Sequence, residues 1–421
     1  MYVKWNIRKN ISMKLENNTI ITEISGLPIA LLHRYTLYGK CPVFQHIFFT
    51  TCGVLICLWN YGFNILHSAA AVYVTYRVLK RLGGSSLSVV IIFVFNMAYL
   101  LCGYYMTSTD DYDIKWTMPQ CVLTLRLIGL AFNLLDGQKP EVRTEQQIFS
   151  MKEEIELHDC IIPGISRMFV GFIYLIFYQL GTSYIPNQYL LSAEFREQTF
   201  LKRLFTIGFW GHFNLYKYIS CWLLAEGVCT TFGLTYNGKD EKGRPLWNGC
   251  ENVKLLKFET ATQFNDYILS FNINTNNWCA EYIYKRLKFL GSKIYSQFFT
   301  LVFLAVWHGL HSGYYICFFL EFIIMYAEKD LSQILKRQQK LQSLLNSRPE
   351  LQILTWILMN MYTFIFMGYC LVCFTFLSYP RYHQVYSSIY YCGHIIYLSY
   401  PLISLLVKIF FLKKRSKKLE Q

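Results

Sequence analysis

Six long stretches of this chain contain no Asp, Glu, Lys or Arg, and this feature limits the folds that the chain can adopt. They are Cys41–Tyr76, Leu82–Thr109, Met168–Ala193, Ile294–Leu320, Leu351–Pro380 and Tyr382–Val407, each between 26 and 36 residues long. A helix of about 20 mostly apolar residues crosses the hydrocarbon core of a bilayer. Each stretch is therefore long enough to span a membrane, and we expect the longest to form two segments separated near Gly62.

Three further segments are apolar but weaker. They are Trp116–Leu135, which contains Arg126, Leu204–Leu234, which contains Lys217 and Glu226, and the short segment Ile20–Leu32. An ionisable group within a span usually faces the protein interior or a water-filled cavity. In total the pattern predicts nine or ten spans, and hence an all-α polytopic membrane protein.

The composition excludes a soluble protein of this size. Hydrophobic residues make up 54% of the chain and charged residues 16%, whereas soluble domains average about 25% charged residues. The net charge of +14 comes from Lys and Arg in short loops and the tail, as the positive-inside rule describes, so we predict no nucleic-acid partner. We expect residues 1–421 to form one integral-membrane domain, with a polar N-terminus over residues 1–19 and a basic cytoplasmic tail over residues 413–421.

The sequence lacks the short motifs of several soluble enzyme classes. It contains no GxSxG nucleophile elbow, no P-loop and no GxGxxG. Cys370 and Cys373 have CxxC spacing, but they lie in an apolar run without a second pair, which favours a packing role. We therefore predict no hydrolase, NTPase or dinucleotide chemistry of these types.

His308 lies in the middle of the charge-free run Ile294–Leu320. A buried imidazole costs free energy unless it is hydrogen-bonded, so its position favours a functional role over that of a satisfied packing residue. Gly309 and Gly313 would let another helix or a ligand approach closely. His311 also permits a site with two histidine ligands, but no third ligand has a supporting spacing, and we predict no metal.

Four asparagines lie between Phe271 and Trp278, namely Asn272, Asn274, Asn276 and Asn277. Asn clusters are typical of turns. This one lies between apolar and basic-aromatic sequence, and irregular backbone is tolerated at membrane depth only where it is buried in protein or lines a cavity. The pattern is equally consistent with a turn and with a functional site.

A basic cluster follows, formed by Lys285, Arg286, Lys288 and Lys293. One interpretation is an anchor at the cytoplasmic membrane surface. The other is contact with the phosphates of a nucleotide-bearing donor such as coenzyme A, because Lys and Arg are the natural partners of phosphate. The two interpretations are compatible.

Together these segments resemble the membrane-bound O-acyltransferase family. The similarity covers most of the chain from about Gly26 onward and is carried by Gly233–Gly238, Phe258–Thr260, Ser270–Asn276, Tyr284–Gly291 and Trp307–Tyr314, with further matches at Met97–Leu101, Tyr112–Pro119, Met367–Tyr369 and Gly393–His394. Between Gln147 and Cys160 the chain lacks some tens of residues that related enzymes have. The resemblance implies a multi-helix bundle that encloses a catalytic chamber.

The resemblance also implies a function. Family members move an acyl chain from acyl-CoA to a hydroxyl, and the branch most similar to this chain re-acylates the sn-2 hydroxyl of lysophospholipids, chiefly lysophosphatidylcholine, with polyunsaturated donors, in the endoplasmic reticulum membrane. It places the catalytic His and Asn at His308 and Asn272. We expect acyl-CoA to be the co-substrate and no other cofactor to be needed. We also expect the protein to lie in a lipid bilayer, where it can form a homodimer. The residues that we expect to contact substrate are Trp307, Asn274, Asn276, Lys285, Arg286 and Lys288.

These residue types suit acyl transfer. A His can remove the proton of an alcohol as the alcohol attacks, and an amide donor such as Asn272 can stabilise the developing negative charge on the carbonyl oxygen. Direct transfer needs no acyl-enzyme, which agrees with the missing nucleophile motif. Two alternatives remain at this point: a non-catalytic or transport protein on the same fold, and an acyltransferase with a different acceptor.

Overall fold

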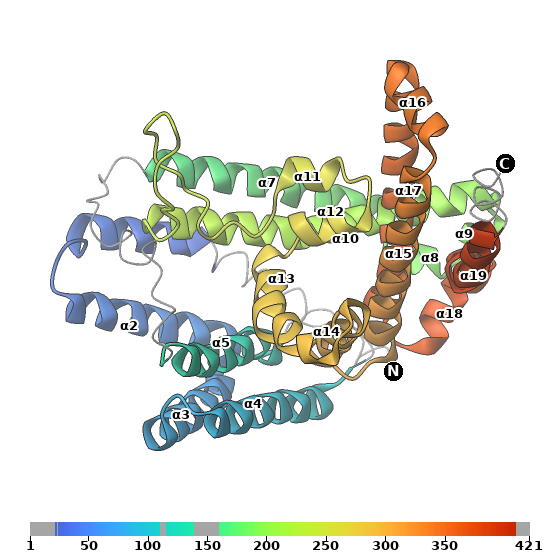
Figure 1. The fold of residues 1–421 in the computed structure, drawn as a ribbon. Coiled ribbons are helices and arrows are strands. Elements are labelled where there is room, and N and C mark those ends of the chain that lie inside the picture. Colours follow the sequence, from blue (N-terminus) through green and yellow to red (C-terminus); the bar gives the residue numbers. More distant parts are fainter. Residues whose placement is uncertain (1–21, 23, 110–114, 139–159, 410–421) are drawn as a thin grey trace.

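The computed structural model describes residues 22, 24–109, 115–138 and 160–409, and this part of the chain is predominantly helical (Figure 1). Its only β-pairing is two isolated bridges, Lys239 with Pro245 and Val253 with Phe271. The predicted all-α class is therefore confirmed. The polar N-terminus, most of the Gln147–Cys160 segment and the basic tail lie outside the described residues.

One helical segment covers residues 24–36. The helices that follow are α2 (Pro42–Tyr61), η1 (Gly62–Asn64), α3 (Ile65–Leu82), α4 (Ser86–Thr107), α5 (Thr117–Asp136), α7 (Ile161–Tyr184), α8 (Asn187–Leu190), α9 (Ala193–Glu197), α10 (Phe200–Thr231), α11 (Leu255–Glu259), α12 (Phe264–Ser270), α13 (Ile273–Cys279), η2 (Ala280–Tyr284), η3 (Lys285–Leu290), α14 (Lys293–His308), α15 (Ser312–Lys336), α16 (Gln339–Ser347), α17 (Pro349–Phe376), α18 (Tyr379–Ser388) and α19 (Cys392–Val407).

Five helical stretches of the described chain are long and apolar enough to cross a membrane. They are Pro42–Leu82, Ser86–Thr107, Thr117–Asp136, Ile161–Leu190 and Pro349–Phe376, and the bent pair α18–α19 makes a sixth if it counts as one span. Helices α10 and α15 also have the length, with 32 and 25 residues, but carry charged side chains within them. The chain is a multi-pass membrane protein, and the count of nine or ten spans stays a prediction.

Two of the predicted spans are each divided between two helices. The run Ile294–Leu320 is divided because Gly309 adopts φ 138° directly after α14, and α15 begins only at Ser312. The run Tyr382–Val407 bends by 81° between α18 and α19, where Tyr391 has φ 50°. Apolar composition permits a helix at both places but does not enforce one. The expected interruption near Gly62 is present as η1.

The helices pack around a core in which α10 is central. Helix α10 packs along α7 and against α17, while α15 packs against α14, α17 and α19. Large side chains such as Trp210, Phe258 and Tyr369 fill the space between them. In Figure 1, α13 and α14 lie between the α7–α10 pair and the group formed by α3, α4 and α5. The segment with the asparagines and the segment with His308 are thereby brought together.

Two predictions from the sequence are confirmed: Gly313 allows another segment to approach closely, and a charge within a predicted span faces the protein interior. At Gly313 a Cβ atom would lie only 2.9 Å from the carbonyl oxygen of Leu377, and the Gly313 N–H donates to that oxygen at 3.0 Å. Within α10, the Glu226 side chain is 4% exposed and pairs with Arg167 of α7 at 3.1 Å. Glu226 therefore faces the protein interior, as a charge within a span is expected to do. Arg126, by contrast, is exposed.

Candidate active site

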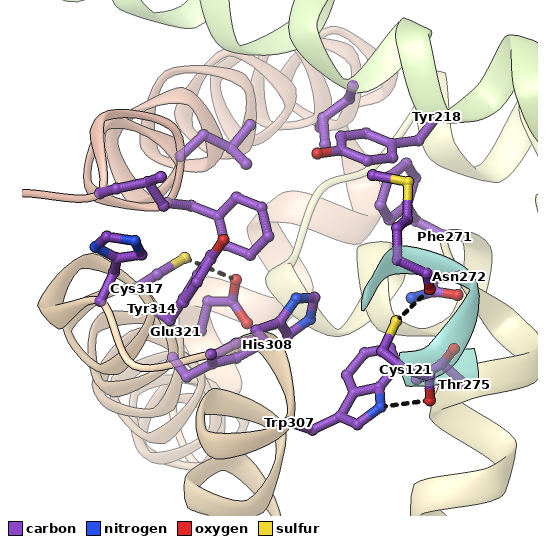
Figure 2. A pocket seen from close by; sticks show the side chains of 18 of the residues that line it. Cys121, Tyr218, Phe271, Asn272, Thr275, Trp307, His308, Tyr314, Cys317 and Glu321 are labelled. Atoms are coloured by element: carbon purple, nitrogen blue, oxygen red, sulfur yellow. Dashed lines mark hydrogen bonds between the residues drawn. The ribbon is translucent and has the colours of Figure 1, made fainter. Parts of the chain in front are cut away.

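A cavity of about 470 Å³ lies where α4, α5, α10, α12, α13, α14, α15 and α17 meet. His308 and Asn272 both line it, although they are 36 positions apart in the sequence (Figure 2). Most of its wall is apolar or aromatic, with contributions such as Phe271, Phe318 and Leu371. The predicted chamber is thus present, and the two residues expected to catalyse the reaction share it.

His308 is the last residue of α14. Its ring lies among the rings of Tyr314, Phe318 and Phe374, with centroid distances of 5.6, 5.3 and 5.1 Å. Within the described chain no side chain forms a hydrogen bond with the imidazole. A packing histidine in such surroundings would need a protein partner, so the geometry favours an imidazole kept for a ligand in the cavity.

Trp307 fixes the end of α14. Its indole Nε1–H donates to the carbonyl oxygen of Cys121 in α5 at 2.9 Å, and its own carbonyl accepts from the hydroxyl of Tyr104 in α4 at 3.0 Å. Trp307 is buried, and Gly309 ends the helix immediately beyond His308. The structure therefore gives Trp307 an anchoring role, and its contact with substrate stays a prediction.

Asn272 immediately precedes α13 and has the left-handed conformation, with φ 52° and ψ 44°. Asn tolerates this conformation better than most residues with a side chain. Its side-chain amide forms no hydrogen bond within the described residues, and Figure 2 shows it at the wall of the cavity. Only Asn272 lies at a turn, because Asn274, Asn276 and Asn277 belong to α13. The interpretation of the cluster as a functional site stays a prediction.

Asn276 supports that turn. Its Nδ2 donates to the carbonyl oxygens of Ile268 and Phe271 at 2.8 and 2.9 Å. Asn276 also lines the cavity, but its amide N–H groups are engaged by the backbone on the N-terminal side of Asn272. These two bonds hold Asn276 against the backbone beside Asn272, and its contact with substrate stays a prediction.

Asn274 does not line the cavity. It is exposed, its backbone N–H donates to the Asn252 side-chain oxygen at 2.9 Å, and its Nδ2 donates to the Cys250 carbonyl at 3.4 Å. The side chain of Asn274 is therefore turned toward a neighbouring loop, and its contact with substrate stays a prediction. Sequence reasoning missed Asn252, which lies in a segment without a motif.

The basic cluster lies away from the lining of this cavity. Lys285 pairs with Glu281. Arg286 pairs with Asp136 of α5 and lies 4.6 Å above the ring of Phe132. Arg286 therefore joins η3 to α5, while Lys288 is exposed. The structure does not place these residues beside His308, and their contact with a donor stays a prediction.

The cavity wall also contains Lys115, His311 and Glu321, which the sequence did not single out as substrate contacts. Lys115 donates to the Thr109 hydroxyl at 2.7 Å, and His311 lies 3.3 Å from the Ser108 hydroxyl. Glu321 directly follows the charge-free run, a signal that could have drawn attention to it. Within the described residues no group of three His, Cys, Asp or Glu side chains could hold a metal ion.

Comparison with known proteins identifies the family. The sequence profile of the membrane-bound O-acyltransferase family matches residues 142–372. The chain belongs to the membrane-bound O-acyltransferase family. It is 40% identical to Lysophospholipid acyltransferase 5 of Mus musculus over 415 residues, which cover 89% of this chain and 85% of the mouse protein. It is 39% identical to the protein of the same name from Homo sapiens, covering 90% of this chain and 86% of the human protein.

A more distant relative extends the similarity within the membrane-bound O-acyltransferases. The Lysophospholipid acyltransferase 5 of Caenorhabditis elegans is 28% identical over 431 residues, with 92% of this chain and 91% of the nematode protein covered. The matched part of the chain includes the segments that carry Asn272 and His308. The segment matched by the family profile therefore contains both residues that share the cavity, Asn272 and His308.

Proposed function

We propose that this membrane-bound O-acyltransferase transfers an acyl chain from acyl-CoA to the sn-2 hydroxyl of lysophosphatidylcholine and related lysophospholipids, in the endoplasmic reticulum membrane and with a preference for polyunsaturated chains. The name shared by the relatives supports a lysophospholipid acceptor. The observation that carries the proposal is the joint position of His308 and Asn272 in one largely apolar cavity, each with a side chain unpaired within the described chain.

In the proposed reaction His308 is the general base. As the acceptor oxygen attacks the thioester carbon, the hydroxyl proton moves to an unoccupied ring nitrogen of His308. The new C–O bond forms a tetrahedral intermediate, whose oxyanion accepts a hydrogen bond from the Asn272 amide. When the C–S bond breaks, the proton on His308 passes to the sulfur, and free coenzyme A and the diacyl phospholipid leave.

The chamber contributes by excluding water. Hydrolysis of the thioester competes with transfer wherever water reaches the activated carbonyl, and an apolar wall limits that access. The rings of Tyr314, Phe318 and Phe374 around His308 provide such a wall. Outside the chamber, we assign Lys285 and Lys288 to the phosphates of the donor, since both are exposed. Assembly as a homodimer stays a prediction.

A panel of acceptors tests the proposal. Purified protein in nanodiscs receives labelled arachidonoyl-CoA together with lysophosphatidylcholine, other lysophospholipids, cholesterol or a serine-containing peptide. We expect the most rapid labelling with lysophosphatidylcholine, and phospholipase A2 should release the label, because that enzyme cleaves at sn-2. Transfer to cholesterol or peptide alone would instead support a different acceptor. Absence of transfer to every acceptor would support a non-catalytic or transport protein.

A further inference from the structure

The mechanism proposed above gives no role to the acidic group that the described residues place in the chamber wall. Glu321 of α15 lines the cavity, and its carboxylate accepts a hydrogen bond from the Cys317 thiol at 3.5 Å. Within the described residues it has no ion pair with Lys or Arg. Removing a carboxylate from water without a cation is costly. A cationic ligand would remove that cost, so the position points to a bound positive charge.

Glu321 lies close to the reacting end of the chamber. Tyr314 and Phe318, on the same helix, contact the ring of His308. Glu321 follows Phe318 by three residues, which is about 4.5 Å along the axis of an α-helix. Figure 2 shows the Glu321 carboxylate and the His308 ring facing the same space. No hydrogen bond joins the two groups in the part of the chain that the structure describes.

Aromatic side chains in the wall suit an organic cation. Among the lining residues that the structure describes, Glu321 is the single carboxylate. Phe264 and Tyr267 of α12, which packs against α15, line the same cavity. Aromatic faces attract quaternary ammonium groups, most strongly when the site is desolvated. A carboxylate combined with such rings provides both charge and apolar contact.

The chemistry of the two substrates decides which of them supplies the cation. The donor carries several phosphates and an apolar acyl chain, so a carboxylate in the chamber would repel its charged part. A choline head group carries a permanent positive charge, separated from the sn-2 carbon only by a short phosphodiester arm. With the sn-2 hydroxyl at His308, that arm extends from His308 toward a neighbouring part of the chamber.

We infer that Glu321 is a specificity-determining residue that binds the cationic head group of the acceptor. This inference rests on the proposed function and adds the group that recognises the head group. It predicts that acceptors with a quaternary ammonium are favoured over anionic lysophospholipids, and that the preference depends on the charge of one side chain.

The test uses Glu321→Gln, which keeps the size of the side chain and an oxygen that can accept from Cys317. Binding is measured with 2-deoxy-lysophosphatidylcholine, which lacks the acceptor hydroxyl, so the result does not depend on turnover. The expected result is about tenfold weaker binding, equivalent to about 1.4 kcal/mol, with binding of 2-deoxy-lysophosphatidylglycerol unchanged or tighter. In turnover, the variant should show a higher KM for lysophosphatidylcholine and a shift in preference toward lysophosphatidylglycerol.

Glu328→Gln is the matched control. Glu328 lies on the same helix outside the cavity lining, and its carboxylate accepts from the Phe264 N–H at 3.0 Å, a bond that a Gln oxygen can also accept. We expect this control to leave the ratio of the two affinities unchanged. An equal change in both variants would overturn the inference.

Two other results would also overturn it. Unchanged binding of 2-deoxy-lysophosphatidylcholine in Glu321→Gln would show that the carboxylate is only packed in the wall. An equal fall in kcat for all acceptors, with unchanged KM values, would show that Glu321 acts on His308 instead. Failure of the proposed function is separate, because it would appear as the absence of transfer by the wild-type protein.

Discussion

Replacement of Asn276 by Ala tests how the turn at Asn272 is held. The side chain donates two hydrogen bonds, at 2.8 and 2.9 Å, to the backbone that precedes Asn272. Each bond contributes about 0.5–1.5 kcal/mol net. The variant therefore loses about 1–3 kcal/mol of the free energy that stabilises the observed turn. Asn272 has a left-handed conformation there, which is itself unfavourable for a residue with a side chain.

The expected consequence is a fall in kcat of about tenfold, because 1.4 kcal/mol corresponds to one factor of ten in rate. KM should change less, since the loss concerns the placement of Asn272 and not a direct substrate contact. Asn277→Ala is the control, because Asn277 is the exposed neighbour on α13. The assay is acyl transfer in nanodiscs with each substrate varied in turn. Normal kcat in Asn276→Ala, or an equal loss in the control, would refute a positioning role, and a rise in KM alone would indicate substrate binding.

Three further outcomes follow from the structure. Gly309→Ala should lower the free energy of unfolding by about 1–3 kcal/mol, because φ 138° strains a residue with a Cβ, and it should lower both kcat and Tm. A normal kcat would show that activity does not depend on the helix break at Gly309. Arg167→Met should lower the free energy of unfolding by about 3–5 kcal/mol, because it leaves Glu226 buried without its cation, and less monodisperse protein should be recovered. Adding Glu226→Gln should restore part of that yield. If the second substitution restores nothing, the ion pair does not stabilise the fold. Lys288→Glu should raise KM for acyl-CoA roughly two- to fivefold, in line with an exposed charge pair of up to about 1 kcal/mol, and an unchanged KM would remove Lys288 from the donor site.

The positions of the long apolar helices could be predicted from the sequence because membrane spans follow from composition. Helices α4 and α17 closely match charge-free runs. The break after His308 could not be predicted, because the apolar residues on both sides favour a helix equally. The helix ends there because Gly309 adopts a conformation outside the helical region. His308 therefore lies in the middle of the charge-free run but at the end of a helix.

The candidate site was predictable in part. His308 stood out as an imidazole in an apolar run, and the asparagine cluster as irregular sequence at membrane depth. Their meeting in one cavity depends on how α13 and α14 pack, which no local pattern encodes. The different roles of Asn274 and Asn276 were also hidden, since the direction of each amide is set by the backbone carbonyls that surround it. Charge alone could not separate Arg286, whose partner is Asp136, from exposed Lys288.

Acyl transfer by His308→Ala, compared with His311→Ala, tests the central claim most directly. Both residues line the cavity and lie three positions apart, so the pair shares residue type, size change and location. Purified variants are supplied with labelled arachidonoyl-CoA and lysophosphatidylcholine after equal folding has been verified by gel filtration. We predict that His308→Ala loses at least a hundredfold in kcat, as expected for a general base, while His311→Ala keeps most of its activity. Full activity in His308→Ala would contradict the account.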